Sequence, residues 1–107
     1  MSSMAENANE NWRHGRVRSA DAVYARVFDE ELVILDLSKG EYLALDPVGA
    51  RLWSGLEAGQ TVEQVAQQIA TEYDVSLDRA LADLISLGDE LVAKGLLVRV
   101  QAGQAKP

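Results

Sequence analysis

Two apolar runs joined by a short turn constrain the fold of this chain more than any other feature. Leu32–Leu37 and Tyr42–Leu45 have the length and composition of strands, and a Ser-Lys-Gly turn separates them, which indicates a β-hairpin. The second run leads directly into Asp46-Pro47, where aspartate can cap a first helical turn and proline loses no hydrogen bond. The sequence therefore predicts a hairpin that continues into a helix.

The register of this hairpin decides which side chains face the core. We expect a three-residue connection, with a type I turn over Ser38 and Lys39 and with Gly40 in the left-handed conformation. This register places Leu35 opposite Leu43. The side chains expected on the core face are Val33, Leu35, Leu43 and Leu45. The side chains expected on the opposite face are Ile34, Asp36, Tyr42 and Ala44.

The rest of the pattern predicts a strand before the hairpin and three helices after it, in the order β-β-β-α-α-α-β. A strand is expected near Ala22–Phe28, and Trp53 is expected to anchor the first helix in the core. The helices are expected at Pro47–Glu57, from a Thr61 cap to Tyr73, and from a Ser76 cap to Lys94, before a short strand at Leu96–Val100. The buried stripe of the second helix is expected to comprise Val62, Val65, Ala66, Ile69 and Tyr73. This is an α+β fold with a three-stranded antiparallel sheet, three helices and a C-terminal strand.

A chain of 107 residues suits a single domain with a tail at each end. We expect a disordered N-terminal tail at residues 1–16, a folded domain at 17–100 and a C-terminal tail at 101–107, because both ends are polar and offer little to bury. The N-terminal tail contains Trp12 followed by basic residues. It is either an untethered leader or a short docking segment.

The charge of the chain limits its partners. The net charge is −7, and the segment Asp29–Glu90 holds fourteen acidic but only three basic side chains. Such a field repels phosphate backbones and anionic lipids, which argues against nucleic acid and membrane surfaces and favours a cationic peptide or a basic protein. The chain has no cysteine, no apolar run of membrane-spanning length and no secretory signal, so we expect it in the cytoplasm.

The sequence carries no recognisable catalytic or cofactor motif. The one histidine, His14, lies in the expected tail, so a nucleophile would have no base inside the domain. Phosphate-binding glycine loops and metal-ligand spacings are missing, and adjacent carboxylates such as Asp89 and Glu90 point in different directions on a solvated helix face. We therefore expect no enzymatic activity, no cofactor and no metal.

The third expected helix is apolar over an unusually wide arc. Its apolar stripe covers roughly 160°, whereas a surface helix needs about 100° to cover a core, so part of the stripe is available to a ligand. Gly88 stands near the middle of this stripe, where glycine is costly unless another backbone comes close. Either Gly88 packs against another helix of the protein, or it lies beside an external peptide. Leu81 and Ile85 are further candidates on this stripe.

The second strand of the hairpin supplies another binding feature. Glu41–Asp46 is an edge of the three-stranded meander unless the C-terminal strand covers it, and it carries no proline to protect the edge. Such an edge can accept a strand from another molecule through main-chain hydrogen bonds. Edge strand and helix stripe together predict one site for an extended peptide.

The residues from Val27 to Val98 resemble the PqqD-like proteins, also known as RiPP recognition elements. The similar segments are "VILDLSKGEYLALDPVGARLW" from Val33, "TVEQVAQQIATEYDV" from Thr61 and "DLISLGDELVAKGLL" from Asp83. In the last segment the residues that match the family pattern are Asp83, Leu84, Leu87, Gly88, Leu91, Gly95 and Leu96.

The resemblance implies a winged helix-turn-helix-like fold that performs no chemistry itself. Such proteins bind the leader segment of a ribosomally made precursor peptide as an added strand and present it to modifying enzymes. The strand ladder would be formed by Glu41, Tyr42, Leu43, Ala44 and Leu45. The groove on the third helix would be formed by Leu84, Leu87, Gly88 and Leu91.

The turn region is similar to the standalone elements of lasso-peptide clusters, in which the leader passes to a separate peptidase before a cyclase acts. The alternatives are a PqqD-type chaperone of quinone-cofactor biosynthesis that works with a radical enzyme, and a winged-helix DNA-binding regulator. The regulator is disfavoured because the expected recognition helix, Ser76–Lys94, carries more acidic than basic side chains. We expect a monomer or a weak homodimer, since the same edge could pair two copies.

Overall fold

The computed structural model describes residues 16–100. Residues 1–15 of the expected N-terminal tail, which include Trp12 and His14, and the expected C-terminal tail at 101–107 lie outside the described residues. The strands are β1 (Arg16–Ser19), β2 (Val23–Phe28), β3 (Glu31–Asp36), β4 (Glu41–Leu45) and β5 (Leu97–Val100). The helices are α2 (Pro47–Glu57), α3 (Val62–Tyr73) and α4 (Leu77–Ala93).

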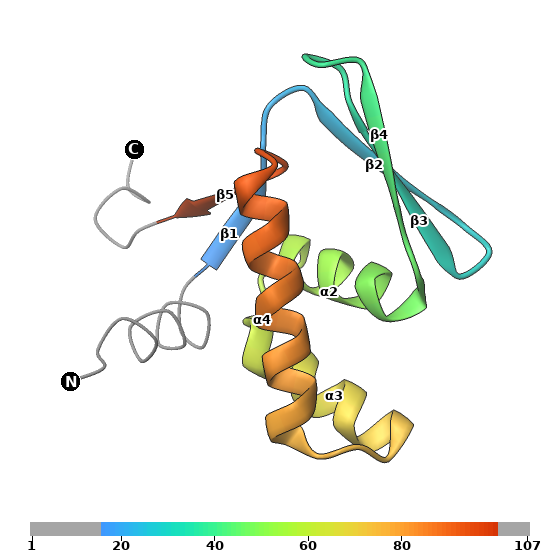
Figure 1. Ribbon diagram of the computed structural model, residues 1–107, viewed down its shortest axis with the longest axis vertical. Coiled ribbons are helices and arrows are strands. Elements are labelled where there is room, and N and C mark those ends of the chain that lie inside the picture. The colour runs from blue at the N-terminus through green and yellow to red at the C-terminus, as the bar shows by residue number, and fades with distance from the viewer. Residues whose placement is uncertain (1–15, 101–107) are drawn as a thin grey trace.

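The strands form two antiparallel sheets. One has the order β2-β3-β4, and the other is a ribbon in which β5 pairs with β1. In Figure 1 the ribbon lies to the left of α4 and the three-stranded sheet lies to its right. The α+β prediction is confirmed, but β1 is a separate strand that the expected order did not contain. It begins at Arg16, the last residue of the expected N-terminal tail.

The connection between β3 and β4 has four residues, not the expected three. Glu41 pairs with Asp36, so Leu37 belongs to the loop together with the Ser-Lys-Gly turn. The carboxylate of Asp36 accepts hydrogen bonds from the backbone N–H (3.1 Å) and the hydroxyl (2.7 Å) of Ser38. Its carbonyl accepts the N–H of Gly40 at 2.9 Å, and Gly40 has the expected left-handed conformation, with φ +68°. The side chain of Asp36 thus builds the turn and lengthens the loop by one residue.

This one-residue shift reverses the expected face of β3 and leaves that of β4 unchanged, because side chains alternate along a strand. The buried face contains Ile34, which is fully buried, and Leu32, whereas Leu35 is 44% exposed and lies opposite Tyr42. The prediction that Val33 and Leu35 face the core with Leu43 and Leu45 was therefore wrong for β3. Leu45 is buried and Leu43 half-buried, as expected for β4.

The three helices begin at the predicted caps. The carboxylate of Asp46 accepts the N–H of Gly49 at 2.8 Å, and Thr61 and Gln64 form the expected capping box. The hydroxyl of Ser76 accepts the N–H of Arg79 at 3.1 Å. These local signals were sufficient to predict the helix starts, because each capping side chain accepts a hydrogen bond from a backbone N–H in the first turn of its own helix.

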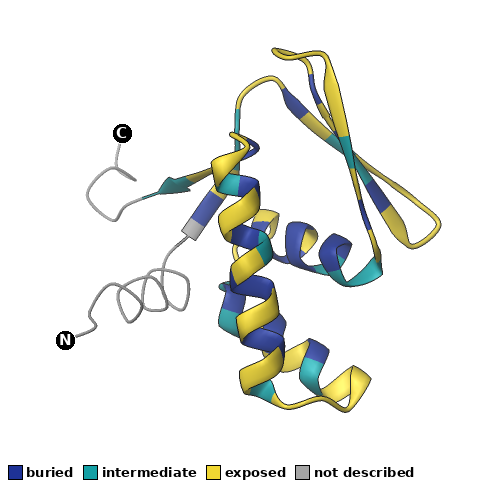
Figure 2. Cartoon of the chain, viewed as in Figure 1, coloured by how far each residue is buried: buried dark blue, intermediate teal, exposed yellow. Residues whose placement is uncertain are grey.

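The core lies where the helices meet the sheets. Trp53 is fully buried, as predicted, and Figure 2 shows most of α2 in the buried colour. Tyr73 is 48% exposed, so its predicted place in the core was wrong: it is the last residue of α3, beyond the reach of the core. The other four members of the predicted α3 stripe are buried.

The close approach of α2 to α3 requires Gly55. A Cβ placed there would lie 2.5 Å from Cγ2 of Val65 and 2.8 Å from the side-chain oxygen of Gln60. We predict that Gly55→Ala lowers the free energy of unfolding by about 1–3 kcal/mol, because overpacking outweighs the gain in helix propensity. Urea denaturation measures the change.

The neighbouring exposed residue supplies the control. Ser54→Ala should change stability by no more than about 0.5 kcal/mol. A Gly55→Ala protein as stable as the wild type would show that the two helices do not need this contact.

Candidate functional site

β4 is an open edge of the three-stranded sheet. It stands last in the order β2-β3-β4, and β5 pairs with β1 instead, so among residues 16–100 no strand covers its outer side. About half of the backbone N–H and C=O groups of an edge strand point away from its neighbour and are available to another chain. The prediction that this strand is an edge is confirmed.

A hollow of about 110 Å³ lies beside this edge. One side of this hollow is formed by residues of β3, β4 and the turn between them. The other side is formed by the C-cap of α4 and the residues just after it. Its lining comprises Ile34, Asp36, Lys39, Glu41, Tyr42, Leu43, Lys94 and Leu96. The open strand and the C-terminal end of α4 therefore border the same space.

At the other end of β4, Leu45 and the α4 residue Leu87 both lie close to Gly49 of α2. A Cβ on Gly49 would lie 3.1 Å from Cβ of Leu45 and 3.3 Å from Cδ2 of Leu87. Gly49 thus allows the start of α2, the end of β4 and α4 to pack closely. Leu87 is half-buried at this point, so part of its side chain remains accessible.

The structure buries most of the α4 residues singled out as candidates. Leu87 is the one member of this set that is partly accessible. The buried members are Leu81 (7% exposed), Leu84 (2%), Ile85 (8%), Gly88 and Leu91 (0%). The wide apolar stripe serves mainly the protein's own core, because α3, β5 and α2 all pack against α4. The burial of Gly88 agrees with its packing inside the protein.

The β4 candidates are far more accessible. Glu41, Tyr42 and Ala44 are exposed, Leu43 is half-buried and Leu45 is buried. Tyr42 is 74% exposed, the largest value among the large apolar side chains of the described chain that are exposed.

Lys39 and Lys94 are site residues that sequence reasoning missed. The ammonium of Lys39 donates a hydrogen bond of 3.0 Å to the carbonyl oxygen of Lys94, 55 residues away. No periodicity or short motif indicates a contact between a turn and a helix end so far apart in sequence. The only local hint is a lysine in a turn of an otherwise acidic segment.

The pKa of Asp36 is clearly displaced. The hydrogen bond from the Ser38 hydroxyl holds the pKa of this carboxyl below its usual value of 3.8, although burial acts in the opposite direction. Backbone hydrogen bonds from Ser38 and Lys39 and the charge of Lys39 lower it further. The ionised carboxylate is therefore the form that holds the turn.

The outer face of the sheet is unusually apolar. Tyr24, Leu35 and Tyr42 are directly opposite one another and form a row across all three strands. All three are exposed, and the sheet in Figure 2 is largely in the exposed colour. An antiparallel sheet usually carries polar residues on its solvent face, so such a patch is typical of a contact surface.

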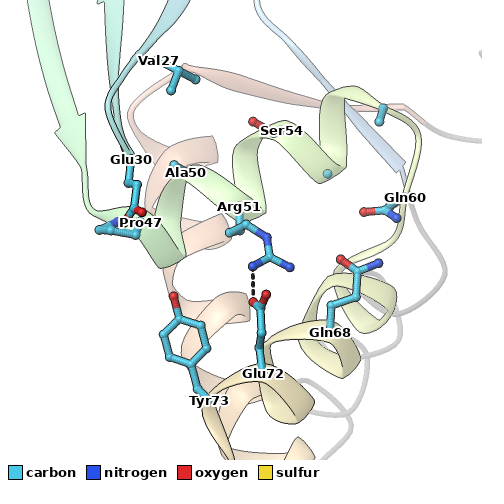
Figure 3. A pocket seen from close by; sticks show the side chains of 12 residues that line it. Val27, Glu30, Pro47, Ala50, Arg51, Ser54, Gln60, Gln68, Glu72 and Tyr73 are labelled. Carbon is cyan, nitrogen blue, oxygen red and sulfur yellow. Dashed lines mark hydrogen bonds and ion pairs between the residues drawn. The ribbon is translucent and has the colours of Figure 1, made fainter.

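A larger hollow of about 650 Å³ lies elsewhere, between the tip of the β2–β3 hairpin, α2 and α3. Figure 3 shows Arg51 and Glu72 facing each other across it, joined by an ion pair. These two side chains neutralise each other, and the sheet and its β2–β3 turn contribute only Val27 and Glu30 to the lining. The strand that reaches this hollow is β2, through Val27, and not β4.

Within residues 16–100, His, Cys, Asp and Glu side chains form no group of three or more suited to a metal ion. No helix in the same range has the length and apolar character needed to cross a bilayer.

The sequence of residues 31–97 matches the model of the family described as coenzyme PQQ synthesis protein D (PqqD). The chain belongs to the PqqD family. Two solved structures are similar to this PqqD-family protein. One is described as "TbiB1 in Complex with the TbiA(beta) Leader Peptide"; it is 39% identical, with 75% of this chain and 93% of that chain covered and a TM-score of 0.70.

The second similar structure is described as "Lasso peptide synthetase B1 complexed with the leader peptide". It is 28% identical, with 78% of this chain and 98% of that chain covered and a TM-score of 0.73. No curated protein matches the chain in sequence. Fold and sequence together thus relate the PqqD-family protein to proteins seen with leader peptides.

The displaced pKa of Asp36 gives a testable dependence of stability on pH. Because the pKa is lowered, the ionised group stabilises the fold above pH 3.8, and this contribution disappears as pH falls through the folded-state pKa. We predict that Asp36→Asn is less stable than the wild type at pH 7 and that the difference shrinks below about pH 4. Urea denaturation at a series of pH values measures it.

The same substitution in a Ser38→Ala protein is the control, since Ser38→Ala removes the hydroxyl that donates to the Asp36 carboxylate. When Asp36→Asn is introduced into the Ser38→Ala protein, the pH-dependent loss of stability should be smaller than in the wild-type background. Parallel stability curves for the wild type and Asp36→Asn would contradict the assigned role of the carboxylate.

Proposed function

We propose that this PqqD-family protein binds the leader segment of a ribosomally made precursor peptide as a strand added to β4, and presents it to a modifying enzyme. The single observation that carries the proposal is the open, apolar edge of β4 beside a hollow at the end of α4. The 39% identical relative seen in complex with the TbiA(beta) leader peptide supports it.

In this proposal β4 supplies the main-chain hydrogen bonds and the hollow supplies selectivity. A peptide strand would lie about 4.8 Å from β4, with alternate side chains on the hollow side and on the outer face. The ladder residues are Glu41, Tyr42, Leu43, Ala44 and Leu45. On α4, Leu87 would contact the peptide, whereas the buried candidates Leu81, Leu84, Ile85, Gly88 and Leu91 would support the groove from beneath.

The proposed role is non-catalytic. It is supported by the lack of a base for a nucleophile within the sequence of the domain and by relatives described through their leader complexes. A lasso-peptide pathway is supported by the similarity to a lasso peptide synthetase B1 protein. A role in quinone-cofactor biosynthesis is the second candidate, supported by the description of the family. Location in the cytoplasm, where ribosomal precursors are made, is part of the proposal.

The outer face of the sheet is the proposed contact surface for the modifying enzyme. A leader strand next to β4 would extend the Tyr24–Leu35–Tyr42 row by one side chain and enlarge the apolar face. The three-stranded face alone spans roughly 10 by 20 Å, less than the ~800 Å² per partner that a stable interface needs. An enzyme that contacts this face would therefore bind best when the leader is present.

The two edge tyrosines allow a matched test. Tyr42 stands on β4 and Tyr24 on β2, in the same row and with the same exposed character. We predict that Tyr42→Thr weakens binding of the TbiA(beta) leader peptide by about two- to fivefold, because a cross-strand pair is lost, and that Tyr24→Thr leaves it unchanged. Isothermal titration calorimetry measures both.

The wild-type protein must bind the peptide in this experiment. Failure of the wild type to bind would overturn the proposed function. Equal losses in the two variants, or a loss with Tyr24→Thr alone, would show that β4 is not the edge that the leader uses.

A further inference from the structure

Lys39 links the β3–β4 turn to the end of α4. Its ammonium donates a 3.0 Å hydrogen bond to the carbonyl oxygen of Lys94, the C-cap residue of that helix. The last turn of α4 contains no basic residue of its own. The carbonyl groups at a helix C-terminus carry partial negative charge and lack partners within the helix. The ammonium bonded to the carbonyl of the C-cap residue thus comes from the turn that precedes β4.

The position of this bond matters because it closes one end of the hollow. Lys39 and Lys94 both line it, together with the first residues of β4. At the other end of the strand, Leu45 and Leu87 pack around Gly49. The five residues of β4 span roughly 16 Å. One end of the strand is linked to the end of α4 through Lys39 in the turn, and the other end approaches α4 through Gly49 of α2. Between them its outer edge stays open.

The turn that carries Lys39 is itself held in shape. The Asp36 carboxylate accepts both the N–H and the hydroxyl of Ser38, next to Lys39. The Asp36 carbonyl also accepts the N–H of Lys39 at 3.3 Å and that of Gly40 at 2.9 Å. These hydrogen bonds hold the backbone of Lys39 in place, so its side chain extends to the end of α4 from a well-ordered turn.

We propose that Lys39 is a positioning residue that sets the spacing between β4 and α4, and so keeps the groove at the width that admits a peptide strand. This inference rests on the proposed function. It adds to the proposed peptide site a residue that belongs neither to the strand ladder nor to the α4 stripe. Lys39 acts through the carbonyl of Lys94 and not through contact with the leader.

The effect of Lys39 on peptide affinity depends on the fraction of molecules in which the groove is open and correctly spaced. Without the bond, the turn end of β4 is held less firmly relative to α4, and a smaller fraction of molecules has the competent spacing. The apparent dissociation constant rises by the inverse of that fraction, and the association rate falls with it. The dissociation rate changes less, because the bound strand itself holds β4 and α4 together.

The experiment compares two lysines of the same hollow. Lys39→Met keeps the apolar stem and removes the ammonium, and should weaken binding of the TbiA(beta) leader peptide by about three- to tenfold, mainly through slower association. Lys94→Met removes the other ammonium but leaves the accepting carbonyl, and should stay within about twofold of the wild type. Lys39→Arg, which can still donate to the carbonyl, should restore most of the affinity. Stopped-flow fluorescence with a labelled peptide gives both rate constants.

Each other outcome has a definite meaning. Equal weakening by Lys39→Met and Lys94→Met would show that the lysines attract the peptide by charge, which overturns the positioning role. Unchanged binding by Lys39→Met would overturn it as well. A circular dichroism melt checks that Lys39→Met is folded, and the Lys39→Arg protein carries the test if it is not. Failure of the wild type to bind the peptide counts against the proposed function instead.

Discussion

The hydrogen bonds between the Asp36 carboxylate and Ser38 are the constraint on which the β3–β4 hairpin and the site beside it depend. They place Leu37 in the β3–β4 loop and thereby fix the pairing of Asp36 with Glu41. That register turns Leu32 and Ile34 to the core and leaves Leu35 on the outer face. It also brings Lys39 to the end of α4. One carboxylate thus sets the core face, the outer face and the spacing of the groove.

The open edge is a second constraint, and it explains why a partner is expected at this site. Backbone groups on an edge must bond to water or to another chain, and an apolar edge without proline or a bulge is poorly protected. β2 is also an outer strand of the sheet, but the hollow that borders the end of α4 lies beside β4. Leader binding at β4 would satisfy the edge and fill the hollow together.

Sequence reasoning succeeded where the signal is local. The caps at Asp46, Thr61 and Ser76 satisfy donors in their own first turns, so the helix starts can be found from a few residues. It failed for the hairpin register because the Asp36 side chain competes for the turn, and a pattern of apolar residues does not report this competition.

The site was only partly predictable from the sequence, because tertiary packing decides which of its residues are accessible. The β4 edge follows from strand order, but the width of the α4 stripe does not tell which helices cover it. Here the fold buries Leu81, Leu84 and Leu91 and leaves Leu87 half-buried. The contact between Lys39 and Lys94 depends on tertiary structure alone.

The central claim is that an extended leader peptide pairs with β4. Isotope-filtered NMR on labelled protein with unlabelled TbiA(beta) leader peptide tests it most directly, because only paired strands give short contacts between backbone protons. The account predicts such contacts from the peptide to residues 41–45, with further contacts to Leu87. Contacts confined to β2, or to the hollow between α2 and α3, would contradict it.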